Sequence, residues 1–398
     1  MAAIEANLRP LSFTPRPGRD RSTQAEQDKA YDDYYTAYTT NRRQLLNGLN
    51  AELARLDTEL NEDARAVGRL LDGGPTDANV QTLWSAGVLP PYAPILYPGA
   101  GLDGADLPPD AQVELVQYLI DHPDLLVNTP AALVAIISAL PTEAQTTIEV
   151  ERRMEQLRQA GHLTGPNPGG RYEEWIRNTV EGGVPAETVL EIAEDHDITP
   201  GSFDVLNGLQ KINDPDGKSF FVLPSDITGD DAEAAVLMSY ILNAGTDYED
   251  GDFEPTPYSS AEIQRIKDRQ DDNDWSYDDD VDFVHGNGGR LVTTPNGMLM
   301  GAGGNELQDV FGQQGGTTWG DIFMVGENDI DDPAAYLEQM IESGTSDVHP
   351  DLDLDQLLHH EERHSQQWAR EGYTWFIAQY LWDADKFEED AGLEDGGY

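Results

Sequence analysis

Three of the chain's eight histidines stand close together in the stretch LLHHEERHSQQW, residues 357–368. Within it, His360, Glu361 and His364 spell the pattern H-E-x-x-H. Residues four apart lie on one face of an α-helix, so both imidazoles can reach one metal ion. Glu361 points off that axis, where it can take a proton from a zinc-bound water and pass it to a leaving amine. The spacing therefore indicates a zinc-dependent peptidase with Glu361 as the general base.

A catalytic zinc site normally has three protein ligands and one position open to water. The chain has no cysteine, so the third ligand must come from histidine, a carboxylate or a carbonyl oxygen. We predict Glu388, which follows His364 on a segment that can fold back along the motif helix and whose apolar neighbours would pack against the core. Glu389 and Asp390 are the alternatives. Zinc is the expected cofactor, with Ca²⁺ as the alternative.

One feature of the motif helix leaves a second interpretation open. Its two middle residues are Glu362 and Arg363, whereas most zinc peptidases have uncharged residues there because that side of the helix is buried. Either this side is solvated, or the pair belongs to a polar network. His359 lies about 100° away from the face shared by His360 and His364, and is interpreted as a supporting or surface group. The alternative to an enzyme is therefore an acidic interaction protein with a degenerate zincin-like scaffold.

Composition and periodicity divide the chain into four parts, and the expected fold class is α+β, mostly helical. A shift to acidic, proline-bearing sequence places a boundary near residue 246. Leucines at spacings of three and four indicate a helix in the second part. The expected parts are a flexible arm at 1–22, a long helix or helical hairpin at 23–75, a helical domain at 76–245 and a zincin-like metallopeptidase domain at 246–398.

The last part should contain a small β-sheet and an active-site helix. The stretches DFVHGN (282–287) and RLVTTPNGMLMG (290–301) predict a hairpin with an Asn-Gly turn, and GGTTWGDIFMVG (315–326) predicts a third strand. A polar helix is expected from Ser260 to about Asp271. Residues 353–381 are strongly helical in pattern.

The net charge of −51 excludes nucleic acid as a partner, because phosphate binding needs a basic patch and none is present. The charge indicates solubility, or divalent cations bound by acidic loops. The stretch DDNDWSYDDDVD (271–282) could coordinate Ca²⁺ or be a solvated loop. INDPDGKS (212–219) has the wrong spacing for an EF-hand and predicts a turn. His285 beside a glycine-rich turn could line a cleft.

The N-terminus lacks the apolar segment of a cleavable signal peptide, and no stretch approaches 18 apolar residues. We therefore expect no membrane span. The chain is expected to be cytoplasmic or secreted by a non-classical, type VII-like route.

LLHHEERHSQQWAREGYTWFIAQYLW followed by FEEDAGLEDGGY resembles actinobacterial metallopeptidase-like proteins of the gluzincin type, H-E-x-x-H…E. TTWGDIF extends the resemblance, which covers about the last 80 residues, and TTPNGMLMG extends it more weakly. The resemblance implies zinc ligands at His360, His364 and Glu388, Glu361 as the base, and a peptide or protein substrate. The overall layout is similar to that of type VII secretion effectors, which implies that the N-terminal helical region meets an export or partner protein.

Overall fold

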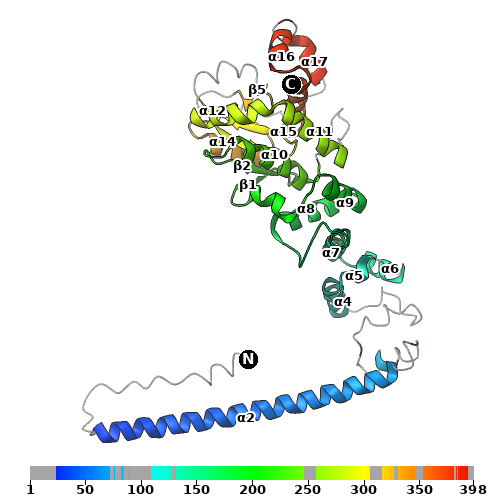
Figure 1. Ribbon diagram of the computed structural model, residues 1–398, viewed down its shortest axis with the longest axis vertical. Helices are drawn as coiled ribbons and strands as arrows, with labels where there is room; N and C mark the ends of the chain where they lie inside the picture. Colours follow the sequence, from blue (N-terminus) through cyan, green and yellow to red (C-terminus); the bar gives the residue numbers. More distant parts are fainter. Residues whose placement is uncertain are drawn as a thin grey trace. The chain divides into compact units, whose positions relative to one another are not determined.

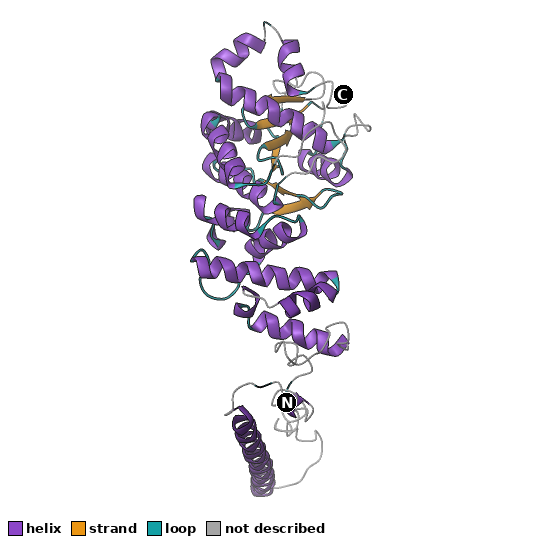
Figure 2. Ribbon diagram, turned by 90° about the vertical axis from the view of Figure 1, so that its right-hand side faces the viewer, coloured by secondary structure: helices purple, strands orange, loops and turns teal. Residues whose placement is uncertain are grey.

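The computed structural model shows a mostly helical α+β protein with a six-stranded mixed sheet, which confirms the predicted fold class (Figure 2). Two compact units are present, Met1–Leu107 and Pro108–Tyr398. The arm predicted for residues 1–22 lies outside the described residues. The structure describes residues 24–71, 76, 82–84, 89, 109–127, 131–245, 257–304, 316–326, 330–345, 353–380, 382 and 384–392.

The first unit contains one unbroken 48-residue helix, α2 (Gln24–Leu71), where the leucine spacing indicated a helix or hairpin (Figure 1). Its leucines are exposed along the helix rather than packed on a second arm of a hairpin: Leu45, Leu49, Leu53, Leu56 and Leu60. Across the described residues, no helix combines the length and apolar character needed to cross a membrane.

Short helices open the second unit, and proline and glycine set their ends as expected. Pro141 and Pro185 occupy the N-cap positions of two of them, and Gly161 ends one with a left-handed φ of 89°. These elements are α4 (Pro109–Asp121), α5 (Asp124–Val127), α6 (Ala131–Ala139), α7 (Thr142–Ala160), α8 (Gly170–Glu181), α9 (Ala186–Asp195) and the 3₁₀ helix η3 (Pro200–Leu206).

The sheet has the strand order β1-β2-β3-β4-β6-β5. All neighbouring pairs are antiparallel except β4 with β6, which is parallel. INDPDGKS forms the turn between the first two strands, as predicted. The strands are β1 (Gln210–Asn213), β2 (Ser219–Val222), β3 (Arg290–Thr293), β4 (Leu299–Ala302), β5 (Gly316–Trp319) and β6 (Ile322–Val325).

The boundary expected near residue 246 does not separate two sheets or two cores. Strand β2 precedes it and β3 follows it, and the two pair directly. One hydrophobic cluster also runs from Val150 to Ile322. The boundary expected near residue 246 therefore falls inside one compact unit, Pro108–Tyr398.

Two local expectations differ from the structure. DFVHGN belongs to helix α12 (Val281–Gly286), because Val281 and Val284 face the core at helical spacing, so only RLVTTPNGMLMG makes the β3–β4 hairpin. GGTTWGDIFMVG holds two strands rather than one. They meet at Gly320, which has a φ of 55°, and a Cβ atom there would lie only 2.7 Å from Cβ of Ser276, so the position requires glycine.

The stretch 271–282 is also helical rather than a loop. It completes α11 (Ser260–Asp272), continues through the π-helical turn η4 (Ser276–Asp280) and enters α12. No three carboxylates from this stretch come within reach of one ion among the described residues, so the calcium loop is not formed there.

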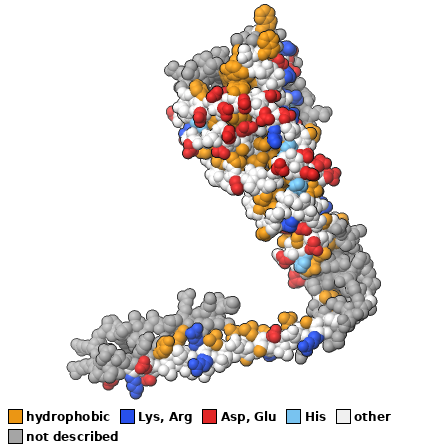
Figure 3. Space-filling model, viewed as in Figure 1, with side chains coloured by type: hydrophobic (Ala, Val, Ile, Leu, Met, Phe, Trp, Pro, Cys, Tyr) orange, Lys and Arg blue, Asp and Glu red, His pale blue; other side chains and the backbone are white. Residues whose placement is uncertain are grey.

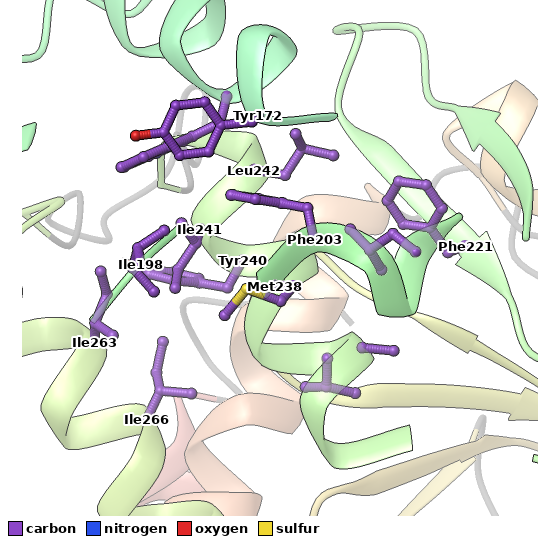
Figure 4. Packing of buried hydrophobic residues seen from close by; sticks show 14 of the residues in the cluster. Tyr172, Ile198, Phe203, Phe221, Met238, Tyr240, Ile241, Leu242, Ile263 and Ile266 are labelled. Carbon is purple, nitrogen blue, oxygen red and sulfur yellow. The ribbon is translucent and has the colours of Figure 1, made fainter. Parts of the chain in front are cut away.

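Alternation along the strands gives the sheet two different faces. Leu291, Leu299 and Ile322 belong to the larger core, with α10 (Gly229–Asn243), α11 and α12. Figure 4 shows part of this core, where Phe203, Tyr240 and neighbouring side chains from η3, α10 and α11 pack together. The other face belongs to a second cluster with α14 (Pro333–Ser343) and α15 (Leu354–Glu371).

Candidate metal centre

Helix α15 carries the H-E-x-x-H pattern and is held firmly against the sheet. Asp353 caps its start by accepting hydrogen bonds from the backbone N–H groups of Asp355 and Gln356. Leu354, Leu357 and Leu358 are buried with Phe323 of the sheet, and each contributes about 1.5–3 kcal/mol to stability. The helix ends at Gly372, after which the chain turns into α16 (Tyr373–Tyr380) and α17 (Ala384–Ala391).

The three predicted ligands come together at one point. Nε2 of His364 lies 3.1 Å from Nε2 of His360 and 3.2 Å from Oε2 of Glu388. Nε2 of His360 lies 3.4 Å from the same carboxylate oxygen. Tetrahedral zinc ligands at about 2.0–2.1 Å from the ion are roughly 3.3–3.4 Å apart. The spacing of the three atoms therefore fits a zinc ion bound between them, with Glu388 supplied by α17.

Nδ1 of each histidine lies close to a hydrogen-bond acceptor, which orients the ring so that its Nε2 can bind a metal. Nδ1 of His360 lies 3.2 Å from the carbonyl oxygen of Ala391, and Nδ1 of His364 lies 2.9 Å from Oε1 of Gln367. A ring that donates from Nδ1 keeps the lone pair on Nε2. Gln367 also donates to the carbonyl oxygen of Phe387, so one side chain links His364 to the helix that carries Glu388.

The site attracts positive charge. Burial lowers the pKa of His364, but its hydrogen bond to Glu388 and the charges of Glu361 and Glu388 outweigh burial and raise the pKa above the ordinary value of 6.5. A divalent cation bound there would meet the same negative potential that now favours a proton.

Glu361 is 5 % exposed and is fixed by a hydrogen bond. Oγ1 of Thr318 donates to its Oε2 over 2.6 Å. Thr318 is paired with Phe323 across the β5–β6 hairpin, which turns its side chain toward the face covered by α15. The carbonyl of Thr318 accepts a hydrogen bond from Nε1 of Trp368 at 2.8 Å, so α15 and the end strand β5 are joined at two points.

The surroundings of Glu362 explain why a charged residue stands in the middle of the motif. It is 4 % exposed, and its Oε1 lies 2.6 Å from Arg265 and 3.2 Å from Arg269, both on α11. Burial raises the pKa of Glu362, but the two guanidinium groups and His359 outweigh burial and lower it overall. Arg363 is exposed. Thus one of the two residues belongs to a buried polar network and the other lies on the solvated side.

The network continues from Arg269 into the core. Arg269 Nε lies 3.2 Å from Oδ1 of Asp321, which is fully buried in the β5–β6 turn. Asn273 and Tyr277 donate hydrogen bonds to the two carboxylate oxygens of Asp321 over 2.9 and 3.0 Å. Ser365 of α15 donates to the same carboxylate. Three segments far apart in sequence are thereby joined beneath the candidate metal centre.

His359 is buried rather than at the surface. Its Nδ1 lies 4.0 Å from Oε2 of Glu362, on the side of α15 away from His360 and His364. Burial lowers the pKa of His359 to about 4, so the ring is neutral around pH 7. His359 therefore supports the network on the back of the helix and is not brought to the cluster of ligand atoms.

The remaining candidates do not form a second metal centre within the described part of the chain. Asp214, Asp216 and Asp355 place oxygen atoms within 4.8 Å of one another. However, Nζ of Lys218 lies 2.5 Å from Asp355, and Asp214 accepts the backbone N–H groups of Asp216 and Lys218 within the β1–β2 turn. A cation and a turn already account for Asp355 and Asp214, and Asp216 is exposed. His285 is buried and has no hydrogen bond among the described residues.

Sequence reasoning missed the residues that support the ligands. Gln367 could have been found, since it stands three residues after His364 on the same helix. Thr318 and Asp321 could not, because nothing in their local sequence reveals that a strand 40 or more residues upstream lies against Glu361 and Ser365. The acceptor for His360 is the backbone carbonyl of Ala391, which any residue type would supply, so the sequence gives no sign of it.

The choice among the three neighbouring acidic residues can be tested directly. Glu388→Ala should weaken zinc affinity by about tenfold or more, equivalent to about 1.4 kcal/mol, because it removes one of three ligand atoms. Glu389→Ala is the matched control, since this neighbouring carboxylate is exposed and is not part of the ligand cluster. Competition with a chromophoric zinc chelator measures both affinities. Equal losses in the two variants would contradict the assignment of Glu388.

A scan against protein-family models, a search of curated proteins and a search of solved structures each found no match to this chain.

Proposed function

We propose that the chain is a zinc-dependent metallopeptidase whose ligands are His360, His364 and Glu388. The observation that carries the proposal is the mutual spacing of their three ligand atoms, 3.1, 3.2 and 3.4 Å. The Nδ1 contacts of both histidines, which keep the lone pair on each Nε2, support it independently. The resemblance of the last 80 or so residues to gluzincin-type proteins agrees with the same ligand set.

When bound, zinc supplies Lewis acidity that polarises a carbonyl and lowers the pKa of water toward neutrality. Glu361 would accept the proton of the attacking water and then deliver it to the leaving nitrogen. Its Oε2 accepts the hydrogen bond from Thr318, which orients the carboxylate and leaves its other oxygen available for the proton. Gln367 would hold His364 and the Glu388 helix in register.

The chain's burial pattern supports a built site rather than a charged surface helix. His360, Glu361 and His364 are 3, 5 and 8 % exposed. Burying polar groups costs free energy unless they have partners, and here each has a hydrogen-bonding partner. A helix that only spelled the motif by chance would have no reason to bury it, which argues against a charged surface helix. The convergence of the three ligand atoms favours the enzyme over the degenerate scaffold.

We expect protein purified without a metal-chelating column to contain about one zinc per chain, and His364→Ala to lose it. Elemental analysis measures the stoichiometry of both. His122→Ala is the control, because it removes an exposed imidazole that follows α4. Zinc-free wild-type protein that also fails to bind added zinc would refute the proposal.

A further inference from the structure

A groove of about 560 Å³ lies on the other side of the β5–β6 hairpin from Glu361. Thr318 faces α15, whereas Trp319, the next residue, faces the groove together with Ile322. Residues of η4 and α12, and Tyr373 at the start of α16, also line it. This volume is within the range of small-ligand and side-chain binding sites.

The lining combines aromatic rings with carboxylates. Its aromatic residues are Trp275, Phe283, Trp319 and Tyr373, and its acidic residues are Asp279 and Asp280. Phe283 and Tyr373 are 44 and 48 % exposed, which is a large solvent exposure for two aromatic side chains in one groove. The faces of aromatic rings attract cations, and nearby carboxylates strengthen that attraction.

Asp280, one of the two carboxylates in the groove lining, has no positively charged partner among the described residues. It is partly buried, and neither a hydrogen bond nor an ion pair to its carboxylate is present among the described residues. Burial, and secondly the charge of Asp279, raises its pKa to about 6. Acidic side chains also gather over the part of the second unit where α11 and α12 lie (Figure 3). A cation entering the groove would relieve this accumulation of like charge.

We propose that the groove binds an arginine or lysine side chain of a peptide. The aliphatic stem would lie against the aromatic walls, and the charged head would meet Asp279 and Asp280. Thr318, which holds Glu361, and Trp319 both lie on the edge strand β5, so we further propose that the same peptide passes over this edge of the sheet to the metal centre. That last step rests on the proposed peptidase function, whereas the binding of a basic side chain does not.

Calorimetric titration of the full chain with three pentapeptides tests the proposal. The peptides are Ac-Ala-Ala-X-Ala-Ala-NH₂ with arginine, citrulline or glutamate at X; citrulline has nearly the same shape as arginine without its charge. We expect the arginine peptide to bind at least tenfold more tightly than the citrulline peptide. The preference for the arginine peptide should persist in EDTA, which removes zinc. This measurement therefore does not depend on zinc binding or on hydrolysis.

Two double variants remove the same amount of charge from the same segment. Asp279→Asn with Asp280→Asn should abolish the preference for arginine over citrulline. Asp278→Asn with Asp282→Asn should retain it, since both residues are exposed and lie outside the groove lining.

Equal binding of the arginine and citrulline peptides by the wild type would overturn the proposal. An equal loss of the arginine preference in the two double variants would also overturn it, because it would show only a general attraction to the negatively charged chain. Arginine binding in EDTA by a protein that never hydrolyses peptide would uphold the groove while refuting the peptidase. Peptide hydrolysis at the same rate with and without arginine, unchanged in both double variants, would uphold the peptidase and refute the groove.

Discussion

Glu361→Gln should abolish peptide hydrolysis while zinc remains bound. The amide has nearly the same shape as the carboxylate, and its oxygen can still accept the 2.6 Å hydrogen bond from Thr318. It cannot accept a proton at neutral pH, so general-base catalysis is lost, a decrease of about 10²–10⁴-fold. Cleavage of a peptide mixture followed by mass spectrometry, together with the zinc content of the same sample, measures both properties.

Glu371→Gln is the matched control for this substitution. It makes the same chemical change at the last residue of the same helix, where Glu371 pairs with Arg370 rather than with the candidate metal centre. Its cleavage rate should equal that of the wild type. If Glu361→Gln cleaved as fast as the wild type, another group would be the base; if it lost the zinc, the role of Glu361 would be structural.

The proposed ligand cluster could be predicted from sequence because two strong local rules apply to it. Helical spacing places His360 and His364 on one face, and the absence of cysteine leaves histidine, a carboxylate or a carbonyl oxygen for the third ligand. The structure brings Glu388 to both imidazoles, as its position on a returning segment indicated. The choice of Glu388 also depended on its apolar neighbours Phe387 and Ala391 and on the resemblance to gluzincin-type proteins.

The parts that were missed depend on contacts between distant segments. The period of DFVHGN is compatible with a strand or a helix over so few residues, and packing against the core selects the helix. The meaning of Glu362 was likewise open, because sequence cannot show that Arg265 and Arg269, almost 100 residues earlier, lie against it. Their spacing of four on one helix was the available signal, but it did not identify their partner.

Arg269→Ala should be among the most destabilising single changes in the chain, lowering the free energy of unfolding by about 3–5 kcal/mol. Arg269 is 3 % exposed and lies 3.2 Å from both Asp321 and Glu362. Without it, Asp321 keeps its hydrogen-bond donors but loses its positive partner, and Glu362 loses one of its two guanidinium partners. Lys267→Ala on the same helix is the control and should change stability by less than about 0.5 kcal/mol. Urea unfolding followed by circular dichroism measures both.

The pH dependence of this loss distinguishes an ionic network from simple packing. The pKa of Glu362 in the folded chain is lower than the ordinary 4.5, so its ionised form stabilises the fold above that pH. This contribution disappears as pH falls through the lowered pKa, because the carboxylate must then take up a proton. The difference in unfolding free energy between wild type and Arg269→Ala should therefore be constant from pH 8 to about 5 and shrink at lower pH. A difference that did not change down to the acid limit of folding would show that Arg269 acts through packing of its aliphatic stem, and not by neutralising the carboxylates beneath the candidate metal centre.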